Sequence, residues 1–153
     1  MKKLLLVLLM SIGSFSEEIS TDIDMFVNKS FLIAKSTKSY KEAKSFSEKI
    51  SKTLGIGINY RRLVFNKSEF LSFSKEECTQ NGWDYPCFIP RGRYDDGVYI
   101  SIEHTNWYDE FSNGYYIVVL ASGKDAPKTL AKVKKHYSDA YVKKAKVYVG
   151  CMH

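Results

Sequence analysis

The sequence predicts an α+β fold in which one four-stranded sheet carries two helices on the same side. Two segments in opposite halves of the chain share the order strand, turn, helix, strand. Each segment is too small to bury its own apolar faces, so the economical solution is to join both in one sheet. The chain that follows residue 16 also has the usual length of a single domain.

Residues 1–16 have the features of a cleavable signal peptide. Two lysines precede an apolar run over residues 4–10, and the small residues Ser14 and Ser16 suit a cleavage site before Glu17. The run is far shorter than the roughly 20 residues that span a bilayer, and no later stretch approaches that length. No cysteine follows the run for lipid attachment. We therefore expect export to the periplasm, with a retained signal that anchors the protein as the alternative.

The charge that remains after cleavage is mildly basic. Removal of Lys2 and Lys3 leaves 21 basic residues against 17 acidic ones, a net charge of +4. This excess favours anionic envelope polymers or lipid head groups over neutral surfaces, but a solvated surface is the preferred explanation. It is too small to predict nucleic-acid binding.

The first repeat follows a polar lead-in over residues 17–30. Residues 31–34 form a short apolar run that predicts a buried strand. Ser39 and Glu42 predict a capping box, and the apolar spacing that follows predicts a helix that ends at Gly55. Residues 58–65 are rich in strand formers and predict the second strand.

The second repeat has the same plan. Residues 115–120 predict a strand. A helix follows, with Asp125 as its predicted N-cap and Pro127 in its first turn, and it is expected to end near Ser138. Residues 141–149 predict the fourth strand. The expected architecture is thus a ferredoxin-like βαββαβ two-layer sandwich, one domain over residues 31–150.

An insertion over residues 66–114 is expected between the two βαβ halves. Val98, Ile100 and Ile102 alternate with Tyr99, Ser101 and Glu103, which predicts a strand with one buried face. Asp95-Asp96-Gly97 predicts a hairpin turn that pairs this strand with residues 87–89 or their neighbours. Cys78 and Cys87 flank a turn-rich stretch and are the preferred disulfide. Cys151 is then unpaired, and three outcomes stay open for it: a dimer, a bond to either other cysteine, or a free thiol.

The order of elements behind an export signal, with Tyr115-Tyr116-Ile117-Val118-Val119-Leu120-Ala121-Ser122 opening the second half, resembles the sporulation-related repeat (SPOR) domain. The resemblance implies a βαββαβ fold that binds peptidoglycan glycan strands stripped of stem peptides, in a groove on the open sheet face. Members often carry a Gln two positions before a Gly-Ser pair. In this chain Ile33 and Val119 replace that Gln, so the polar contact that it implies is missing.

A glycan site needs aromatic rings for the sugar faces, and amides or charges for the hydroxyls and carboxylates. The candidates of these types, which core packing explains as well, are Tyr60, Arg62, Trp83, Tyr85, Arg91 and Arg93. Arg91-Gly92-Arg93 has the composition of a carboxylate clamp.

We find no catalytic set, metal-ligand spacing or cofactor motif, and expect a non-enzymatic binding module of the periplasm. The alternative is a scaffold component of a cell-envelope machine that uses the same fold for protein–protein contacts.

Overall fold

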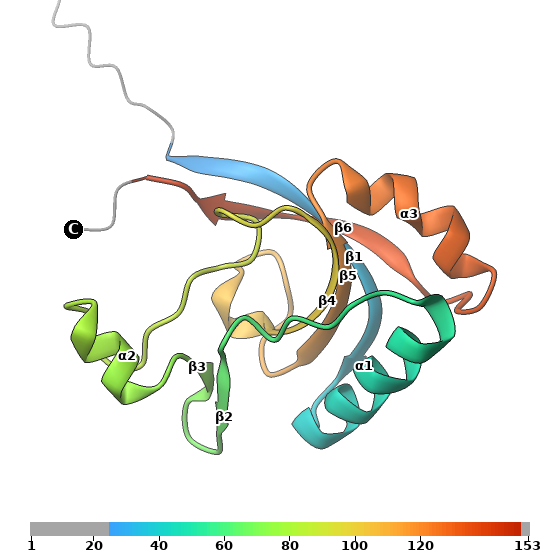
Figure 1. Ribbon diagram of the computed structural model, residues 1–153. Helices are drawn as coiled ribbons and strands as arrows, with labels where there is room; N and C mark the ends of the chain where they lie inside the picture. Colours follow the sequence, from blue (N-terminus) through green and yellow to red (C-terminus); the bar gives the residue numbers. More distant parts are fainter. Residues whose placement is uncertain (1–24, 151–153) are drawn as a thin grey trace, which may run out of the picture.

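The computed structural model describes residues 25–150. The expected signal peptide and Cys151 therefore lie outside the described residues. Within them the chain has an α+β fold, with a four-stranded antiparallel sheet and three α-helices (Figure 1). None of these helices is long and apolar enough to cross a membrane.

The main sheet has the strand order β4-β5-β1-β6, and neighbouring strands are antiparallel. Its strands are β1 (Phe26–Thr37), β4 (Gly97–His104), β5 (Tyr116–Ser122) and β6 (Tyr141–Tyr148). The helix α3 (Asp125–Lys134) connects β5 to β6, which lies on the other side of β1. The helix α1 (Tyr40–Leu54) follows β1, and the chain then reaches β4 on the other side of β5. Both connections therefore cross over a strand of the same sheet.

The predicted second strand is wrong. Residues 58–65 contribute only a bridge between Ile58 and Ile100 and the start of a small hairpin. The strand that pairs with β5 is β4, from within the expected insertion. The expected hairpin between residues 87–89 and 98–100 does not form. One edge of β4 pairs with β5, and at its other edge Ile100 bonds with the backbone of Gly57 and Asn59. The inserted segment therefore comprises residues 55–96 and not 66–114. It lies inside the first βαβ unit, between α1 and β4, and not between the two halves.

The first helix has the predicted ends, with one change in its cap. The Ser39 hydroxyl accepts the Glu42 N–H at 3.3 Å, and Gly55 closes α1 with φ of 66°. The Glu42 carboxylate does not return to the Ser39 N–H. It accepts from Thr37 Oγ1 at 2.6 Å and pairs with Lys35 at 2.8 Å, so it fastens the helix to the end of β1.

The boundaries of two other elements differ from the prediction. β1 begins at Phe26, so part of the expected lead-in over residues 17–30 is strand. Asp125 lies in the first turn of α3 and not at its N-cap, where Lys124 provides no side-chain hydrogen bond. The helix ends at Lys134, before Ser138. The first-turn position of Asp125 still suits the helix dipole.

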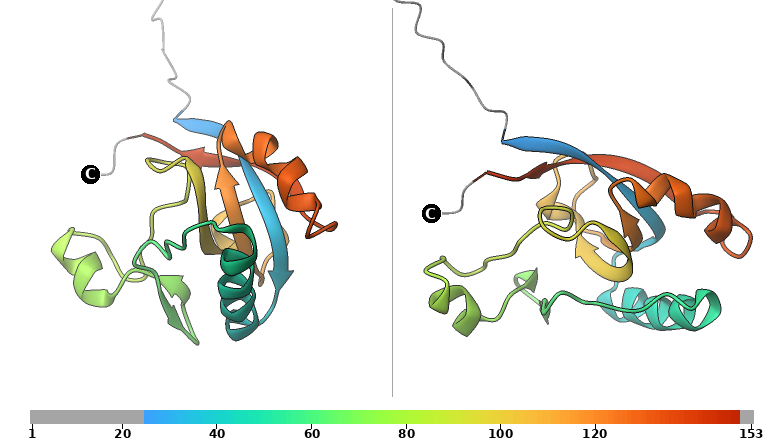
Figure 2. Two further views of the ribbon diagram at one scale, coloured as in Figure 1. Left: turned by 45° about the vertical axis from the view of Figure 1, so that its right-hand side comes forward. Right: turned by 45° about the horizontal axis from the view of Figure 1, so that its top comes forward.

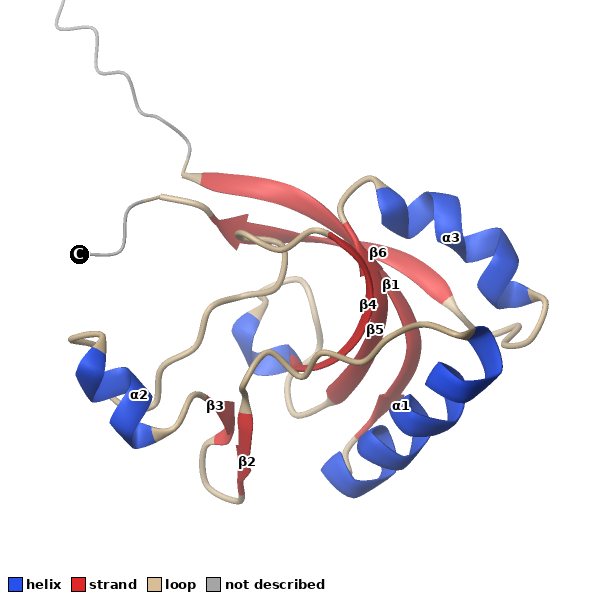
Figure 3. Cartoon of the chain, viewed as in Figure 1, coloured by secondary structure: helices blue, strands red, loops and turns tan. Residues whose placement is uncertain are grey.

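Each face of the sheet has its own core. Both α1 and α3 lie on one side of the sheet (Figures 1 and 3). The core on that side contains Leu32, Ile50, Val118, Leu120 and Val133, among others. The second core, on the opposite face, consists of Phe31, Ile33, Tyr108, Phe111, Ile117, Val119, Ala145 and Val147. Alternate residues of β1 and β5 contribute to the two cores, as strand geometry requires.

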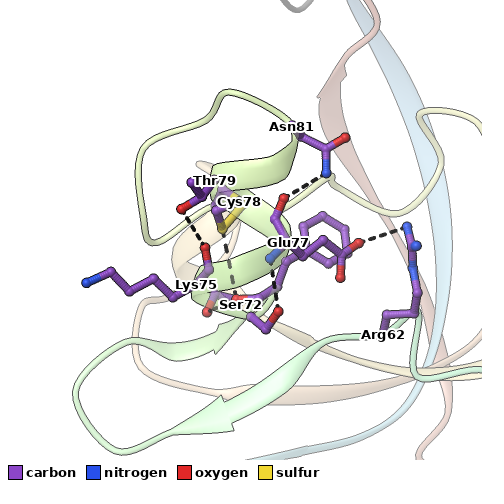
Figure 4. The surroundings of a disulfide bond; sticks show 10 residues. Arg62, Ser72, Lys75, Glu77, Cys78, Thr79 and Asn81 are labelled. Atoms are coloured by element: carbon purple, nitrogen blue, oxygen red, sulfur yellow. Dashed lines mark hydrogen bonds and ion pairs between the residues drawn. A yellow bond between two sulfur atoms is a disulfide. The ribbon is translucent and has the colours of Figure 1, made fainter.

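The inserted segment carries the strands β2 (Val64–Asn66) and β3 (Phe70–Ser72) and the helix α2 (Lys75–Gln80). The α2 end projects away from α3 (Figure 2). The predicted disulfide between Cys78 and Cys87 is confirmed, with 5.8 Å between the Cα atoms. Figure 4 shows the surroundings of this bond, where Arg62 pairs with Glu77 at 3.0 Å. Ser74 caps α2, because its hydroxyl accepts from the Glu77 N–H at 3.1 Å. Buried Leu71, Phe73 and Cys78 extend the first core beyond β4.

Candidate functional site

The sheet face opposite the helices is covered. After β4 the chain forms the 3-10 helix η1 (Thr105–Trp107) and then crosses this face. Tyr108 and Phe111 close over Phe31 and other residues of the second core, with the Phe31 and Tyr108 ring centroids 5.4 Å apart. The open groove that the family resemblance implies at this place is therefore filled by the protein's own connection between β4 and β5.

Arg91 lies over the β4–β5 part of the sheet and is fully buried. Its guanidinium donates to Ser101 Oγ at 2.9 Å, to Ser122 Oγ at 3.2 Å, and to the backbone carbonyls of Val119 at 3.0 Å and Gly97 at 3.1 Å. It also lies 3.7 Å from the centre of the Tyr99 ring. Because four hydrogen bonds go to the protein itself, Arg91 is a structural residue and not the ligand clamp that the sequence suggests.

A second buried arginine balances the charges around Arg91. Arg61 donates to Asp95 at 2.7 Å and to Glu103 at 3.0 Å, and Glu103 is itself 2% exposed. Burial alone lowers the pKa of Arg61, but these carboxylates outweigh it and hold that pKa above its ordinary value. The pKa of Asp95 is lowered, because the hydrogen bond from Tyr99 and the charge of Arg61 outweigh its partial burial. The network therefore contains two cations and two anions.

The candidate site is an aromatic pocket of about 330 Å³ where three parts of the chain meet. The ribbon of β1 and β6 forms one wall, the end of the inserted segment a second, and the connection after β4 a third. The lining residues are Phe26, Phe88, Pro90, Trp107, Asp109, Lys146 and Tyr148. Four of the seven are aromatic, so the pocket offers several flat apolar surfaces beside one cation and one anion.

Three polar side chains of the pocket have no partner in the part of the chain that the structure describes, whereas the Tyr148 hydroxyl bonds with Met25. The Trp107 ring stacks on Phe88 with centroids 3.8 Å apart, and its indole Nε1 is buried with no hydrogen-bond partner among residues 25–150. Neither Lys146 nor Asp109 forms an ion pair within the same range, and both are exposed. The pocket can therefore stack a ring, donate from an indole and an ammonium group, and accept at a carboxylate.

Arg93 supports one wall of this pocket. Its guanidinium donates to the Tyr148 carbonyl at 2.8 Å and to the Gly150 carbonyl, and lies 5.1 Å from the centre of the Tyr148 ring. Only 7% of the residue is exposed. Of the residues that the sequence suggests as ligands, Arg93 is the one that the structure places beside this pocket.

The other sequence candidates lie elsewhere in the inserted segment. Tyr60 is half-buried against the first core, and its hydroxyl is 2.8 Å from Ser47 Oγ. Trp83 packs near Phe73, with centroids 6.4 Å apart, and Arg62 lies 5.7 Å above the same ring. Tyr85, which is 36% exposed, bonds with Asn66 at the β2 hairpin. Tyr60 thus lies against α1, Arg62, Trp83 and Tyr85 lie near the disulfide loop, and none of the four lines the pocket.

The pocket uses residues that the sequence interpretation did not select. The available signal was the Trp107-Tyr108 pair directly after a predicted strand, but nothing local shows that Phe26, far away in sequence, reaches it. No group of three or more His, Cys, Asp or Glu side chains within residues 25–150 has a geometry that suits a metal ion. Comparison of the chain with protein-family models, with curated proteins and with solved structures gives no match.

Proposed function

We propose that the protein is an exported, non-enzymatic binding module that holds a peptidoglycan glycan strand in the aromatic pocket. The observation that carries the proposal is the pocket itself, in which the stacked pair of Phe88 and Trp107 stands beside an unpaired indole N–H and an unpaired ammonium group. Sugar rings present apolar faces and a rim of hydroxyls, and this combination of groups is complementary to both.

The charge of the pocket favours glycan that has lost its stem peptides. Removal of a stem peptide by an amidase leaves a free carboxylate on the sugar that carried it. Lys146 provides a cation for that carboxylate at the rim of the pocket, and Trp107 Nε1 provides a neutral donor. Asp109 can accept from sugar hydroxyls. An intact stem peptide replaces the carboxylate by an amide and so removes the charged contact.

The fold and the disulfide support the same proposal. The strand order β4-β5-β1-β6, with α1 and α3 on one side, supports the ferredoxin-like βαββαβ arrangement that the SPOR resemblance implies. The bond between Cys78 and Cys87 suits an oxidising compartment such as the periplasm. In this proposal the ligand lies at the end of the β1–β6 ribbon, because the centre of the sheet face is covered.

The test is retention of the purified protein on cell-wall sacculi, intact and amidase-stripped. We expect enrichment on stripped sacculi, and we expect Lys146→Gln to weaken retention by roughly 10-fold, equivalent to about 1.4 kcal/mol for the loss of one charged contact. Lys144→Gln is the matched control, because Lys144 is an exposed lysine of the same strand that does not line the pocket. Trp107→Phe keeps a stacking ring and removes only the indole donor.

A titration in solution gives a second measurement of the same site. In a Trp83→Phe background, Trp107 is the single tryptophan, so its fluorescence reports directly on the pocket. Soluble stripped glycan fragments should change that emission in a saturable way. Retention on neither type of sacculus, or equal loss in the Lys146 and Lys144 variants, would refute the proposal and favour the alternative of a protein scaffold.

A further inference from the structure

A second cavity lies at the opposite end of β1, between the start of α1 and the strand β2. Its volume is about 540 Å³, larger than that of the proposed glycan pocket. It is lined by Lys38, Ser39, Tyr40, Lys41, Lys44, Phe65 and Tyr116. We call this cavity the basic cup. Three aromatic rings and three lysines supply most of its wall.

The three rings of the basic cup hold one another in place. Tyr40 and Phe65 are stacked, with centroids 4.7 Å apart and ring planes within 3°. Tyr116 stands at about 60° to both, at 5.6 Å and 6.2 Å. Tyr116 also packs against His104, which is fully buried, so the floor of the cup is continuous with the core. Phe65 at the rim is 41% exposed, an unusual exposure for a large apolar ring that belongs to a stacked cluster.

The charged groups of the basic cup have no ionic partner among the described residues; the Lys38 ammonium lies 5.5 Å above the Tyr115 ring, and the Ser39 hydroxyl caps α1. Lys38, Lys41 and Lys44 are exposed, and none forms an ion pair within residues 25–150, whereas Lys35 next to them is held by Glu42. No carboxylate lines the cup. The hydroxyls of Tyr40 and Tyr116 likewise have no hydrogen-bond partner in the part of the chain that the structure describes. The cup therefore presents three cations and two neutral donors around an apolar floor, with nothing to neutralise them.

We propose that the basic cup binds an acidic segment of a protein partner, with one apolar side chain inserted among the three rings and neighbouring carboxylates paired with the lysines. The three lysines require a partner with negative charge, and the recessed shape of the cup favours a protein segment over a membrane surface. The apolar atoms form the floor of a recess, which suits an inserted side chain. A membrane would require apolar groups that protrude from the surface.

The two proposed sites can be occupied together. The twelve residues of β1 separate Phe26, in the aromatic pocket, from the residues that begin the basic cup. At about 3.3 Å per residue the separation along the strand is about 35 Å. The protein would thus hold the wall at one end of the sheet and a partner protein at the other. This inference does not rest on the glycan proposal, because no residue is shared by the two sites.

The test uses a defined peptide probe, acetyl-Asp-Glu-Phe-Glu-Asp-amide, titrated into the ¹⁵N-labelled protein. We expect saturable shifts of the amides at the start of α1 and around Phe65 and Tyr116. Two control peptides separate the contributions: Asn-Gln-Phe-Gln-Asn removes the charges, and Asp-Glu-Gly-Glu-Asp removes the ring. Each should bind at least 10-fold more weakly. Equal binding of either control, or no shift at all with the probe, overturns the proposal.

Protein variants locate the binding. The double variant Lys41→Glu, Lys44→Glu should weaken binding of the probe at least 10-fold, and the double variant Lys132→Glu, Lys134→Glu on α3 is the control with the same change in net charge. Because Phe65 is partly exposed, Phe65→Ala should fold and should lose the ring-dependent part of the affinity.

The membrane alternative and the glycan site need their own measurements. Vesicles of phosphatidylcholine with phosphatidylglycerol test the membrane: retention that depends on Lys41 and Lys44, with no binding of the probe peptide, would overturn the proposal in favour of a lipid surface. The Lys41, Lys44 variant should still be retained on stripped sacculi, and Lys146→Gln should still bind the peptide. Failure of one proposal is thus distinguishable from failure of the other.

Discussion

Replacement of Arg91 by Met should strongly destabilise the protein, because the guanidinium is the centre of the polar network under the covered sheet face. Methionine keeps much of the volume of the side chain and removes the charge and all donors. Four acceptors then lose their partner: the hydroxyls of Ser101 and Ser122 and the carbonyls of Val119 and Gly97. No water replaces the donors easily, because the residue is 0% exposed.

The size of the effect follows from the charge balance. Without Arg91, the carboxylates of Glu103 and Asp95 share one cation, Arg61. Removal of one partner from a buried ionic group costs roughly 3–5 kcal/mol, a large part of the 5–15 kcal/mol that stabilises an ordinary domain. Arg91→Lys keeps the charge but not the planar fork that reaches all four acceptors, so we expect about half of that loss.

Urea unfolding of the oxidised protein, followed by tryptophan fluorescence and circular dichroism, measures this effect. With a slope of about 2 kcal/mol per molar urea, the midpoint of Arg91→Met should fall by roughly 1.5–2.5 M. Arg62→Met is the control: its side chain is 77% exposed, and its ion pair with Glu77 should contribute less than about 1 kcal/mol. A midpoint for Arg91→Met within about 0.5 M of the parent protein would refute the reasoning, because the buried guanidinium would then be dispensable.

Two further predictions concern pH and the disulfide. Burial lowers the pKa of His104 from 6.5 to about 4, so the unfolded chain binds a proton at this imidazole more tightly than the folded protein does. The free energy of unfolding should therefore be highest above pH 6.5 and lower by about 2 kcal/mol at pH 5. His104→Gln should lose this pH dependence, as urea unfolding at both pH values would show. An unchanged pH dependence in that variant would contradict the assignment to His104. Reduction of the bond between Cys78 and Cys87 opens a loop with a sequence separation of 9 and should cost about 2.5 kcal/mol, measured as the difference between urea midpoints with and without reductant. The double variant Cys78→Ser, Cys87→Ser should show the same loss and no response to reductant, and a larger midpoint in the reduced protein would contradict the estimate.

The elements that the sequence predicted well are those with local signals. Ser39 and Gly55 mark the ends of α1 because a hydroxyl at the N-cap and a left-handed residue at the C-terminus satisfy backbone groups within a few residues. The disulfide was predicted for a similar reason, since a short turn-rich loop brings its two cysteines together. Helix α2 carried the same kind of signal, Ser74 followed by Glu77, and was missed because the segment was interpreted as a hairpin.

The second strand shows where local signals fail. Residues 58–65 and residues 97–104 both have strand composition, and only pairing with β5 distinguishes them. The alternation along β4 also misled in one respect. Ser101 and Glu103 suggested a wet face, yet both are buried, because Arg91 crosses that face and satisfies or balances them. Ser101, a polar strand residue that the alternation predicts to be exposed, is therefore buried, because Arg91, ten residues earlier, donates a hydrogen bond to it.

The candidate site was beyond sequence reasoning for the same physical reason. Phe26, Phe88 and Trp107 form one pocket only because the β1–β6 ribbon, the inserted segment and the β4–β5 connection converge in space. Composition predicted the kind of residue that a glycan site requires, aromatic rings with cations, but not which of the many aromatic residues in this chain remain accessible.

The sequence by itself determined the fold class, three of the four sheet strands, both main helices and the disulfide, because hydrophobic periodicity, capping and short-range loop closure act over a few residues. The tertiary structure alone decided which segment became the second strand, which arginine was buried, and where aromatic rings stayed open. These outcomes depend on strand pairing and on the burial of charges between residues that are distant in sequence. Such interactions form only when the chain folds, so no local pattern predicts them.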